Sequence, residues 1–194
     1  MYIPVMSRRN ILAALILTLI ASICFALPVN LLQDASFDDG MLDTPFSSNW
    51  MPFGQAHCVS DDARTGVYCA KLFGNFRSEQ NWSGLYQDVP VTPGKKYIAN
   101  GYLRQNTGDR LEGGSLAWIK LEFYDAEDNQ LMIAESPVRL GARSAANRWL
   151  FFSTSPVIAP GGAVKVRVVA IFEQQSDNAP GAVLVDDLTL RPVD

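Results

Sequence analysis

Three segments of the sequence alternate between a small or aliphatic side chain and a side chain that is aromatic or charged. The aromatic and charged members that we take as candidate ligand contacts are Tyr102, Arg104, Trp118, Lys120, Glu122 and Glu173. Aromatic rings stack on the apolar faces of sugar rings, and polar side chains fix the hydroxyl groups by hydrogen bonds. These residue types therefore predict a carbohydrate-binding surface, provided that they face the same cleft.

For the other aromatic residues a role in ligand binding has packing in the domain as its alternative. Trp82 and Tyr86 lie in and after a loop, and we expect them to line one end of the cleft. The alternatives are that Tyr86 is a half-exposed strand residue and that Trp118 packs under the loop of residues 105–115. Trp50 and Trp149 are assigned to the core, because bulky aromatics dominate the interior of β-sandwiches. A face shared by Tyr102 and Trp118 favours binding, whereas a covered face favours a structural domain.

A catalytic site has little support in the sequence. Glu122 and Glu173 are the one carboxylate pair that we consider for glycoside hydrolysis, which needs two carboxylates across a cleft. His57 is the only histidine. Neither a Gly-x-Ser-x-Gly elbow nor an HExxH motif occurs, so the serine hydrolase and zinc protease patterns are missing. We therefore expect a protein that is not an enzyme.

Short strands separated by turn residues must position these side chains. The apolar runs are bounded by Pro-Gly, Asp-Asn and Gly-Gly turns at regular spacing, which is typical of a β-sandwich or jelly roll. The expected strands cover residues 85–91, 97–104, 116–124, 131–134, 148–155, 163–172 and 182–190. Successive side chains on a strand point to opposite faces, so each run has one apolar face and one mixed face.

The last of these strands breaks its alternation. Val183 and Val185 require the same inward face as Leu188 and Leu190, although three positions separate Val185 from Leu188. A β-bulge at residues 186–187 resolves the conflict and turns one carboxylate in a special direction.

The amino-terminal segment and the net charge limit the classes of protein that fit this sequence. Residues 1–26 combine a basic start, an apolar run and a small residue before Leu27, which is the pattern of a cleaved signal peptide. A retained membrane anchor is the alternative. Residues 27–194 then form one domain, and removal of Arg8 and Arg9 raises the excess of acidic over basic side chains from four to six. Such an acidic chain argues against nucleic acid as a partner.

Two cysteines remain in residues 27–194. Cys58 and Cys69 flank a polar turn that we interpret as a hairpin, and in an exported protein two cysteines suggest one disulfide. A zinc site is the alternative, but two thiols and one His57 supply too few ligands.

Several of these segments together resemble the carbohydrate-binding modules of the CenC type. The opening of residues 30–40, with Phe37 followed by Asp38, resembles the first strand of that family, and residues 85–97 resemble its stretch with a Pro-Gly turn. Residues 121–125 and 185–190 complete the similarity, which covers nearly all of residues 27–194. The resemblance implies an all-β jelly-roll sandwich of the galactose-binding-domain type.

The resemblance also implies a structural calcium ion near the two chain ends. Its ligands would be Asp38 and Asp186, with Asp34 as a third, because Ca²⁺ prefers oxygen ligands. The alternative is that these acids cap turns at the surface.

We therefore expect a monomeric, exported protein, secreted or periplasmic, with no membrane span after signal cleavage and a glycan as its partner. The second hypothesis is a structural or protein-interaction domain of the cell envelope without a sugar site, because fold does not fix function.

Overall fold

The computed structural model describes residues 29–40, 46–60 and 62–193. In these residues twelve strands and no helix occur, arranged in two antiparallel six-stranded sheets. The expected signal peptide lies outside the described residues. The described residues contain no helix long and apolar enough to cross a membrane.

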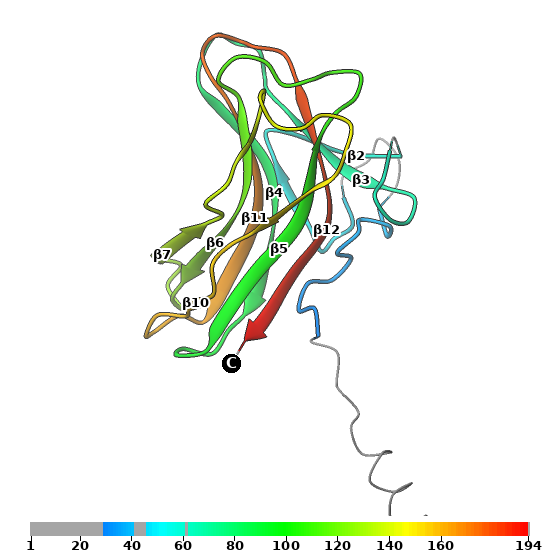
Figure 1. The fold of residues 1–194 in the computed structure, drawn as a ribbon. Coiled ribbons are helices and arrows are strands. Elements are labelled where there is room, and N and C mark those ends of the chain that lie inside the picture. Colours follow the sequence, from blue (N-terminus) through cyan, green and yellow to red (C-terminus); the bar gives the residue numbers. More distant parts are fainter. Residues whose placement is uncertain (1–28, 41–45, 61, 194) are drawn as a thin grey trace, which may run out of the picture.

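The first sheet, called sheet A, has the order β1-β4-β11-β6-β7, with the short β8 beside β6. Its strands are β1 (Met51–Phe53), β4 (Asn81–Pro90), β11 (Lys165–Gln174), β6 (Leu116–Tyr124), β7 (Gln130–Glu135) and β8 (Leu140–Gly141). Strands β4, β11 and β6 are the long central strands, and they lie side by side in one layer (Figure 1).

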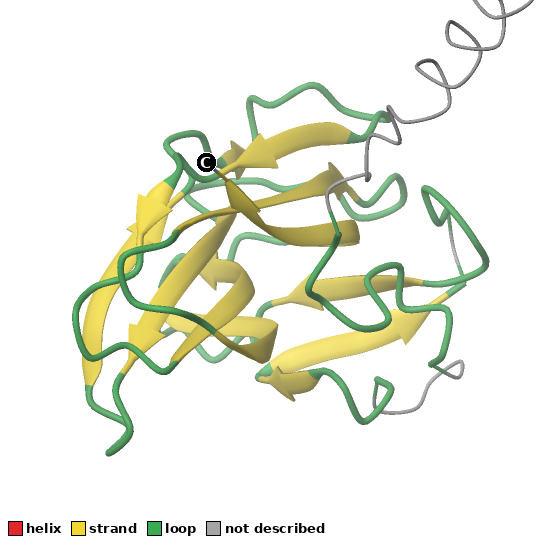
Figure 2. Ribbon diagram, turned by 90° about the horizontal axis from the view of Figure 1, so that it is seen from below, coloured by secondary structure: helices red, strands yellow, loops and turns green. Residues whose placement is uncertain are grey.

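The second sheet, sheet B, has the order β10-β5-β12-β3-β2, with β9 also paired to β5. Its strands are β10 (Val157–Ile158), β5 (Lys96–Gln105), β12 (Ala182–Val193), β3 (Cys69–Phe73), β2 (Gln55–Val59) and β9 (Leu150–Ser153). The two sheets form the layers of a sandwich, which Figure 2 shows from below. The predicted all-β jelly-roll sandwich is confirmed.

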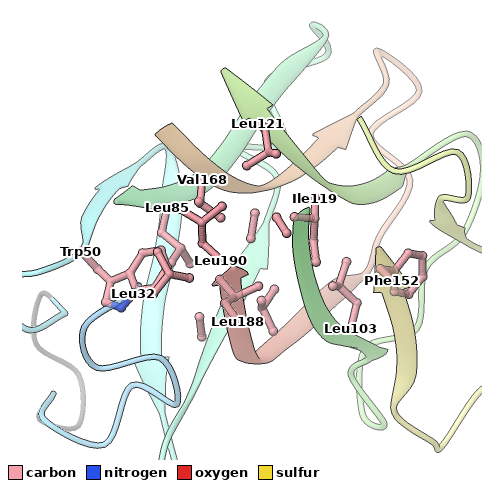
Figure 3. Close-up of a cluster of buried hydrophobic side chains, with 14 of the residues drawn as sticks. Leu32, Trp50, Leu85, Leu103, Ile119, Leu121, Phe152, Val168, Leu188 and Leu190 are labelled. Atoms are coloured by element: carbon pink, nitrogen blue, oxygen red, sulfur yellow. The ribbon is translucent and has the colours of Figure 1, made fainter. Parts of the chain in front are cut away.

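The core lies between the layers and follows the predicted alternation. Leu85, Leu121 and Val168 reach inward from sheet A, and Leu103 and Leu188 meet them from sheet B (Figure 3). All five side chains are fully buried. At roughly 2 kcal/mol for each fully buried aliphatic side chain, this interface supplies much of the free energy of folding.

The predicted bulge in β12 is present. The pairing of β12 with β5 changes register between Asp186 and Thr189, and Asp187 adopts a left-handed φ of 49°. Leu188 and Leu190 thereby return to the core with Val183 and Val185. The bulge leaves Asp186 on the outward side of sheet B.

Two of the packing predictions have different outcomes. Trp50 is buried in the core, and its indole N–H donates to the Asp34 carbonyl at 2.8 Å. Trp149 is only half-buried and lies outside the regular strands, so its assignment to the core is wrong. It precedes β9 at the edge of the sandwich, where Arg104 covers one side of its ring at 5.6 Å.

Candidate functional site

The candidate residues are divided between two outward faces. Tyr102 and Arg104 lie on β5 in sheet B, whereas Trp118, Lys120 and Glu122 lie on β6 in sheet A. Strands β5 and β6 follow each other in the chain, but the connection between them crosses from one layer to the other. The predicted groove shared by Tyr102 and Trp118 is therefore wrong, because the mixed faces of the two strands point away from each other.

A cleft of about 300 Å³ lies on the outward face of sheet A. Val169 and Ile171 of β11 form its floor and are almost fully buried. The remaining lining residues are Phe53, Tyr86, Lys120, Glu122 and Arg167. Two aromatic rings and three charged side chains thus surround an apolar floor, which is the composition that a sugar-binding cleft requires.

Gly84 of β4 creates the place for the ring of Phe53. Gly84 pairs with Phe53 of β1, and a Cβ at this position would come within 2.6 Å of the Phe53 ring. It would also come within 2.4 Å of the Ala170 carbonyl. The bare backbone lets the ring lie across the strand, and so fixes one wall of the cleft.

Lys120, Glu122 and Tyr124 form a polar chain along one strand. The Lys120 ammonium lies 2.6 Å from one oxygen of Glu122, and the Tyr124 hydroxyl donates to the other at 2.7 Å. Burial, followed by this hydrogen bond to Glu122, raises the pKa of Tyr124. Both Lys120 and Glu122 are mostly buried, so their polar atoms are held in fixed directions at the rim of the cleft.

Arg167 forms the opposite part of the rim. Its guanidinium donates two hydrogen bonds to Asp88, at 2.7 and 3.0 Å, and lies 3.9 Å from the centre of the Tyr86 ring. Burial raises the pKa of the Asp88 carboxyl, but Arg167 and Lys165 outweigh burial and hold that pKa below its usual range. The bidentate pair orients Arg167 against Tyr86 and makes the two side chains one rigid unit.

Trp118 is a buried support beside the cleft. It is 5% exposed, its indole N–H donates to Glu135 at 3.0 Å, and the Arg139 guanidinium lies 3.9 Å from its ring centre. The predicted alternative placed it beneath the loop of residues 105–115, whereas the covering contacts are made by Glu135 and Arg139. Trp118 packs with Val169 and Ile171 and so holds the floor.

Trp82 and Glu173 lie on the same outward face, at the end of β4 and β11. The two residues are directly paired, and Trp82 is 48% exposed. The Gln80 amide donates a hydrogen bond to Glu173. The structure therefore brings six of the eight predicted contact residues to sheet A, with Lys120, Glu122 and Tyr86 lining the cleft itself.

Four residues that line the cleft were not among the predicted contacts. Phe53 lies on β1, which has only three residues and therefore shows no readable alternation. Arg167, Val169 and Ile171 share the outward face of β11 with Glu173. Their alternation with the inward Val166, Val168 and Ala170 was the available signal.

On sheet B the centre of the outward face is covered. Arg64 lies 3.5 Å from the centre of the Tyr102 ring, and Arg104 forms an ion pair with Asp62. Asp186 is fully buried and accepts hydrogen bonds from the Arg64 and Thr65 amides at 2.7 and 3.2 Å. The turn of residues 62–68 thus lies over the centre of this face.

The three acids predicted to bind calcium already accept hydrogen bonds. Asp38 accepts from the Val67 and Tyr68 amides at 2.7 and 3.1 Å, and Asp34 accepts from Ser47 at 2.5 Å. Among the described residues no group of three carboxylate, imidazole or thiol side chains lies close enough to hold a metal ion. Among the described residues Asp34, Asp38 and Asp186 therefore do not form one cluster of three carboxylates.

These hydrogen bonds connect the two ends of the domain through the 62–68 turn. Asp38 binds one end of the 62–68 turn and Asp186 binds the other. Burial first, and then the charge of Asp187, raise the pKa of Asp186 to about 7. For Asp38, burial raises the pKa, but hydrogen bonds from Val67, Tyr68 and Ser36 lower it below its ordinary value.

The predicted disulfide between Cys58 and Cys69 is not formed in the structure. The two residues lie on paired strands, but Cys58 is opposite Ala70 and Cys69 is opposite Val59. Side chains one position out of register point to opposite faces of a hairpin. Cys58 points into the core, where burial raises its thiol pKa to about 11, and no bond joins it to Cys69.

The carboxylate pair considered for catalysis is too widely separated. Glu122 is opposite Arg167 on β11, and Glu173 lies six residues farther along that strand. At about 3.3 Å per residue the two positions are roughly 20 Å apart, whereas glycosidases hold their carboxylates about 5 to 9.5 Å apart. His57 is exposed and stacks on Phe73, 5.4 Å away and outside the cleft.

Solved structures similar to this chain include carbohydrate-binding modules and domains of larger proteins. A structure of TmCBM61 in complex with β-1,4-galactotriose has a TM-score of 0.56 at 17% identity, over 85% of this chain and 99% of the other. The CBM22-1 xylan-binding domain of Xyn10C from Paenibacillus barcinonensis has a TM-score of 0.58 at 17% identity, over 86% and 96%.

A third similar structure is the enzymatically active domain of tailspike protein 4 from bacteriophage CBA120. It has a TM-score of 0.57 at 13% identity, and the similarity covers 85% of this chain and 22% of the tailspike chain. No family model and no curated protein matches the sequence. At these identities the similarity establishes the jelly-roll fold of the carbohydrate-binding modules.

Proposed function

We propose that the protein binds a glycan in the sheet A cleft and does not transform it. The observation that carries this proposal is the cleft itself, in which Phe53 and Tyr86 face an apolar floor inside a rim of Lys120, Glu122 and Arg167. The rings supply stacking surfaces, and the rim supplies donors and acceptors for hydroxyl groups. Trp118 supports the floor, while Tyr102 and Arg104 lie outside this site.

The ion pairing of the charged residues at the rim favours an uncharged sugar in the cleft. Lys120 is paired with Glu122, and Arg167 is paired with Asp88, so each cation already has its counter-ion. A sugar hydroxyl would use the remaining donor and acceptor positions of these groups without burying a new charge. The modules with the same fold include one in complex with β-1,4-galactotriose and one that binds xylan. Neutral β-1,4-linked galactan and xylan are therefore the first ligands to test.

The test is isothermal titration calorimetry of the protein with oligosaccharides of galactan and xylan, comparing Tyr86→Ala with Phe151→Ala. Phe151 is 59% exposed on sheet B and is the matched control for loss of an outward aromatic ring. We expect Tyr86→Ala to weaken binding at least about tenfold, and Phe151→Ala to leave it unchanged. Equal losses in both variants would contradict the site. Absence of binding to any glycan would favour the structural or protein-interaction domain.

The absence of catalysis is part of this proposal. The separation of Glu122 from Glu173 and the position of His57 outside the cleft support it. We expect no release of reducing ends when the protein is incubated with the glycan that it binds.

We further propose that residues 1–26 are a signal peptide and that the exported domain is a secreted or periplasmic monomer. We also propose that this domain is a module of the CenC type. The resemblance of residues 30–40 and 185–190 to that type supports the class. Amino-terminal sequencing of the exported protein tests the cleavage, with Leu27 as the expected first residue. Light scattering tests the monomer.

Calcium binding stays a prediction from the family resemblance. Asp34, Asp38 and Asp186 do not form one cluster of three carboxylates in the described residues, and Asp38 and Asp186 accept hydrogen bonds from the 62–68 turn. Melting of the protein in calcium and in chelator measures this directly. A melting temperature that chelation lowers supports the ion, and an unchanged one contradicts it.

A further inference from the structure

A second hollow opens at the end of sheet A where β6 begins. Its volume is about 610 Å³, and the backbone of glycines 113, 114 and 141 forms part of its wall. Arg139 and Arg143 are its two charged lining residues, so among the described residues that form its wall there are two cations and no carboxylate. The lining itself therefore carries two positive charges, and the acids beside it include Asp177, which lies against Gly113, and Glu135, which pairs with Arg139.

The two arginines are in different states. Arg139 forms an ion pair with Glu135 at 2.6 Å and lies over the Trp118 ring. Arg143 is exposed, and no hydrogen bond or ion pair engages its guanidinium in the described part of the chain. The segment of residues 136–149 adds a third arginine, Arg148, and contains no Asp or Glu. A positive charge without a nearby counter-ion is the arrangement that attracts an oxyanion.

The hollow adjoins the cleft across Trp118. Leu116 lines the hollow and packs against Trp118, whose other neighbours Val169 and Ile171 form the cleft floor. Leu116 and Lys120 are four residues apart on β6, which is about 13 Å of strand. One extended ligand is therefore able to contact both places.

We infer that this hollow binds an anionic substituent, a carboxylate or a sulfate ester, on a glycan whose uncharged part occupies the sheet A cleft. This inference rests on the proposed function and adds to it a substrate class, the acidic glycans. Arg143 is the residue that contacts the anion, because guanidinium groups form bidentate hydrogen bonds with carboxylate and sulfate oxygens. Arg139 remains with Glu135 and closes the side of the hollow toward Trp118.

The experiment measures affinities of the protein for three oligosaccharides of matched length: uncharged galactan, polygalacturonate and a sulfated galactan. We expect one of the two acidic ligands to bind about tenfold more tightly than galactan at low salt, and sodium chloride to reduce this difference. The ligand that gains identifies the anion as carboxylate or sulfate. Equal affinities for all three ligands would overturn the inference and leave binding of uncharged glycan in place.

Three variants locate the anion. Arg143→Gln and Ala142→Glu change exposed residues of the hollow, and both are expected to remove the preference for the acidic ligand without weakening galactan. Lys96→Gln removes an exposed charge from β5 of sheet B, outside the hollow. This variant is expected to leave all three affinities unchanged. If Lys96→Gln lowers the preference as much as Arg143→Gln does, the preference comes from net charge and the site does not exist. If the protein binds none of the three ligands, the proposed function falls as well.

Discussion

On sheet A the outward side chains of β11 border an open cleft, whereas on sheet B the outward side chain of Asp186 is fully buried beneath a turn. The amides of Arg64 and Thr65 bind this carboxylate, and the Arg64 guanidinium covers the Tyr102 ring. Both sheets present aromatic and basic residues outward. Among the described residues, sheet A is where two such rings remain beside an accessible apolar floor.

The difference between the faces comes from segments outside the central strands. Sheet B receives the long 62–68 turn, which Asp38 and Asp186 hold at its two ends. Sheet A receives the short strand β1, whose Phe53 ring lies across Gly84 and forms a wall without covering the floor. An outward residue is therefore a ligand contact or a structural contact according to what docks on it.

The largest expected effect compares Trp118 with Phe151, one outward aromatic residue from each sheet. Trp118 is 5% exposed and Phe151 is 59% exposed. We expect Trp118→Ala to reduce the free energy of unfolding by about 3 to 5 kcal/mol, because it leaves a cavity and removes the contacts that Glu135 and Arg139 make with the indole ring. Phe151→Ala should change it by less than about 1 kcal/mol. Urea unfolding followed by fluorescence measures both values, and similar losses would mean that Trp118 is not a support of the floor.

The strand alternation was predictable because it depends only on nearest neighbours along the chain. Ala117, Ile119, Leu121 and Phe123 all point inward as expected, and the bulge at Asp186 followed from the same count. The sheet to which a strand belongs depends on pairing between distant segments. The sequence around residues 102 and 118 does not indicate that β5 pairs with β12 while β6 pairs with β11.

The candidate site was also predictable only where it depends on local strand alternation. Lys120, Glu122 and Tyr86, which were predicted as ligand contacts, line the sheet A cleft, and all three lie on long, regular strands. Phe53 was missed because β1 is three residues long and owes its position to pairing with β4. Tyr102 was assigned wrongly to the shared groove because its cover, Arg64, comes from a loop 38 positions earlier whose docking leaves no periodic signal.

A smaller effect tests whether the turn really closes sheet B. Burial raises the pKa of Asp186 from 3.8 to about 7, so the folded protein holds this proton more tightly than the unfolded chain does. The resulting stability is fully present below pH 4 and is lost as pH rises through about 7. Between pH 5 and pH 7 the loss is on the order of 2 kcal/mol.

The measurement is urea unfolding in chelator at pH 5 and pH 7 for the wild-type protein and Asp186→Asn. The variant cannot titrate at this position, so its stability should decline less over the interval, and the difference between the two proteins isolates Asp186. Identical pH dependence would mean that water reaches this carboxylate and that the face of sheet B is as open as that of sheet A.

The smallest expected effect concerns the edge hairpin of sheet B. Cys58 and Cys69 are one position out of register on β2 and β3, and Cys58 points into the core. Reducing agent should therefore leave the urea midpoint unchanged, whereas loss of a disulfide would lower stability by about 2 to 4 kcal/mol. Burial also raises the pKa of Cys58 to about 11, so iodoacetamide at pH 8 should label this residue after unfolding and spare it in the folded protein. A reductant-sensitive midpoint would instead require the hairpin to shift by one residue, which would turn either Cys58 out of the core or Cys69 into it.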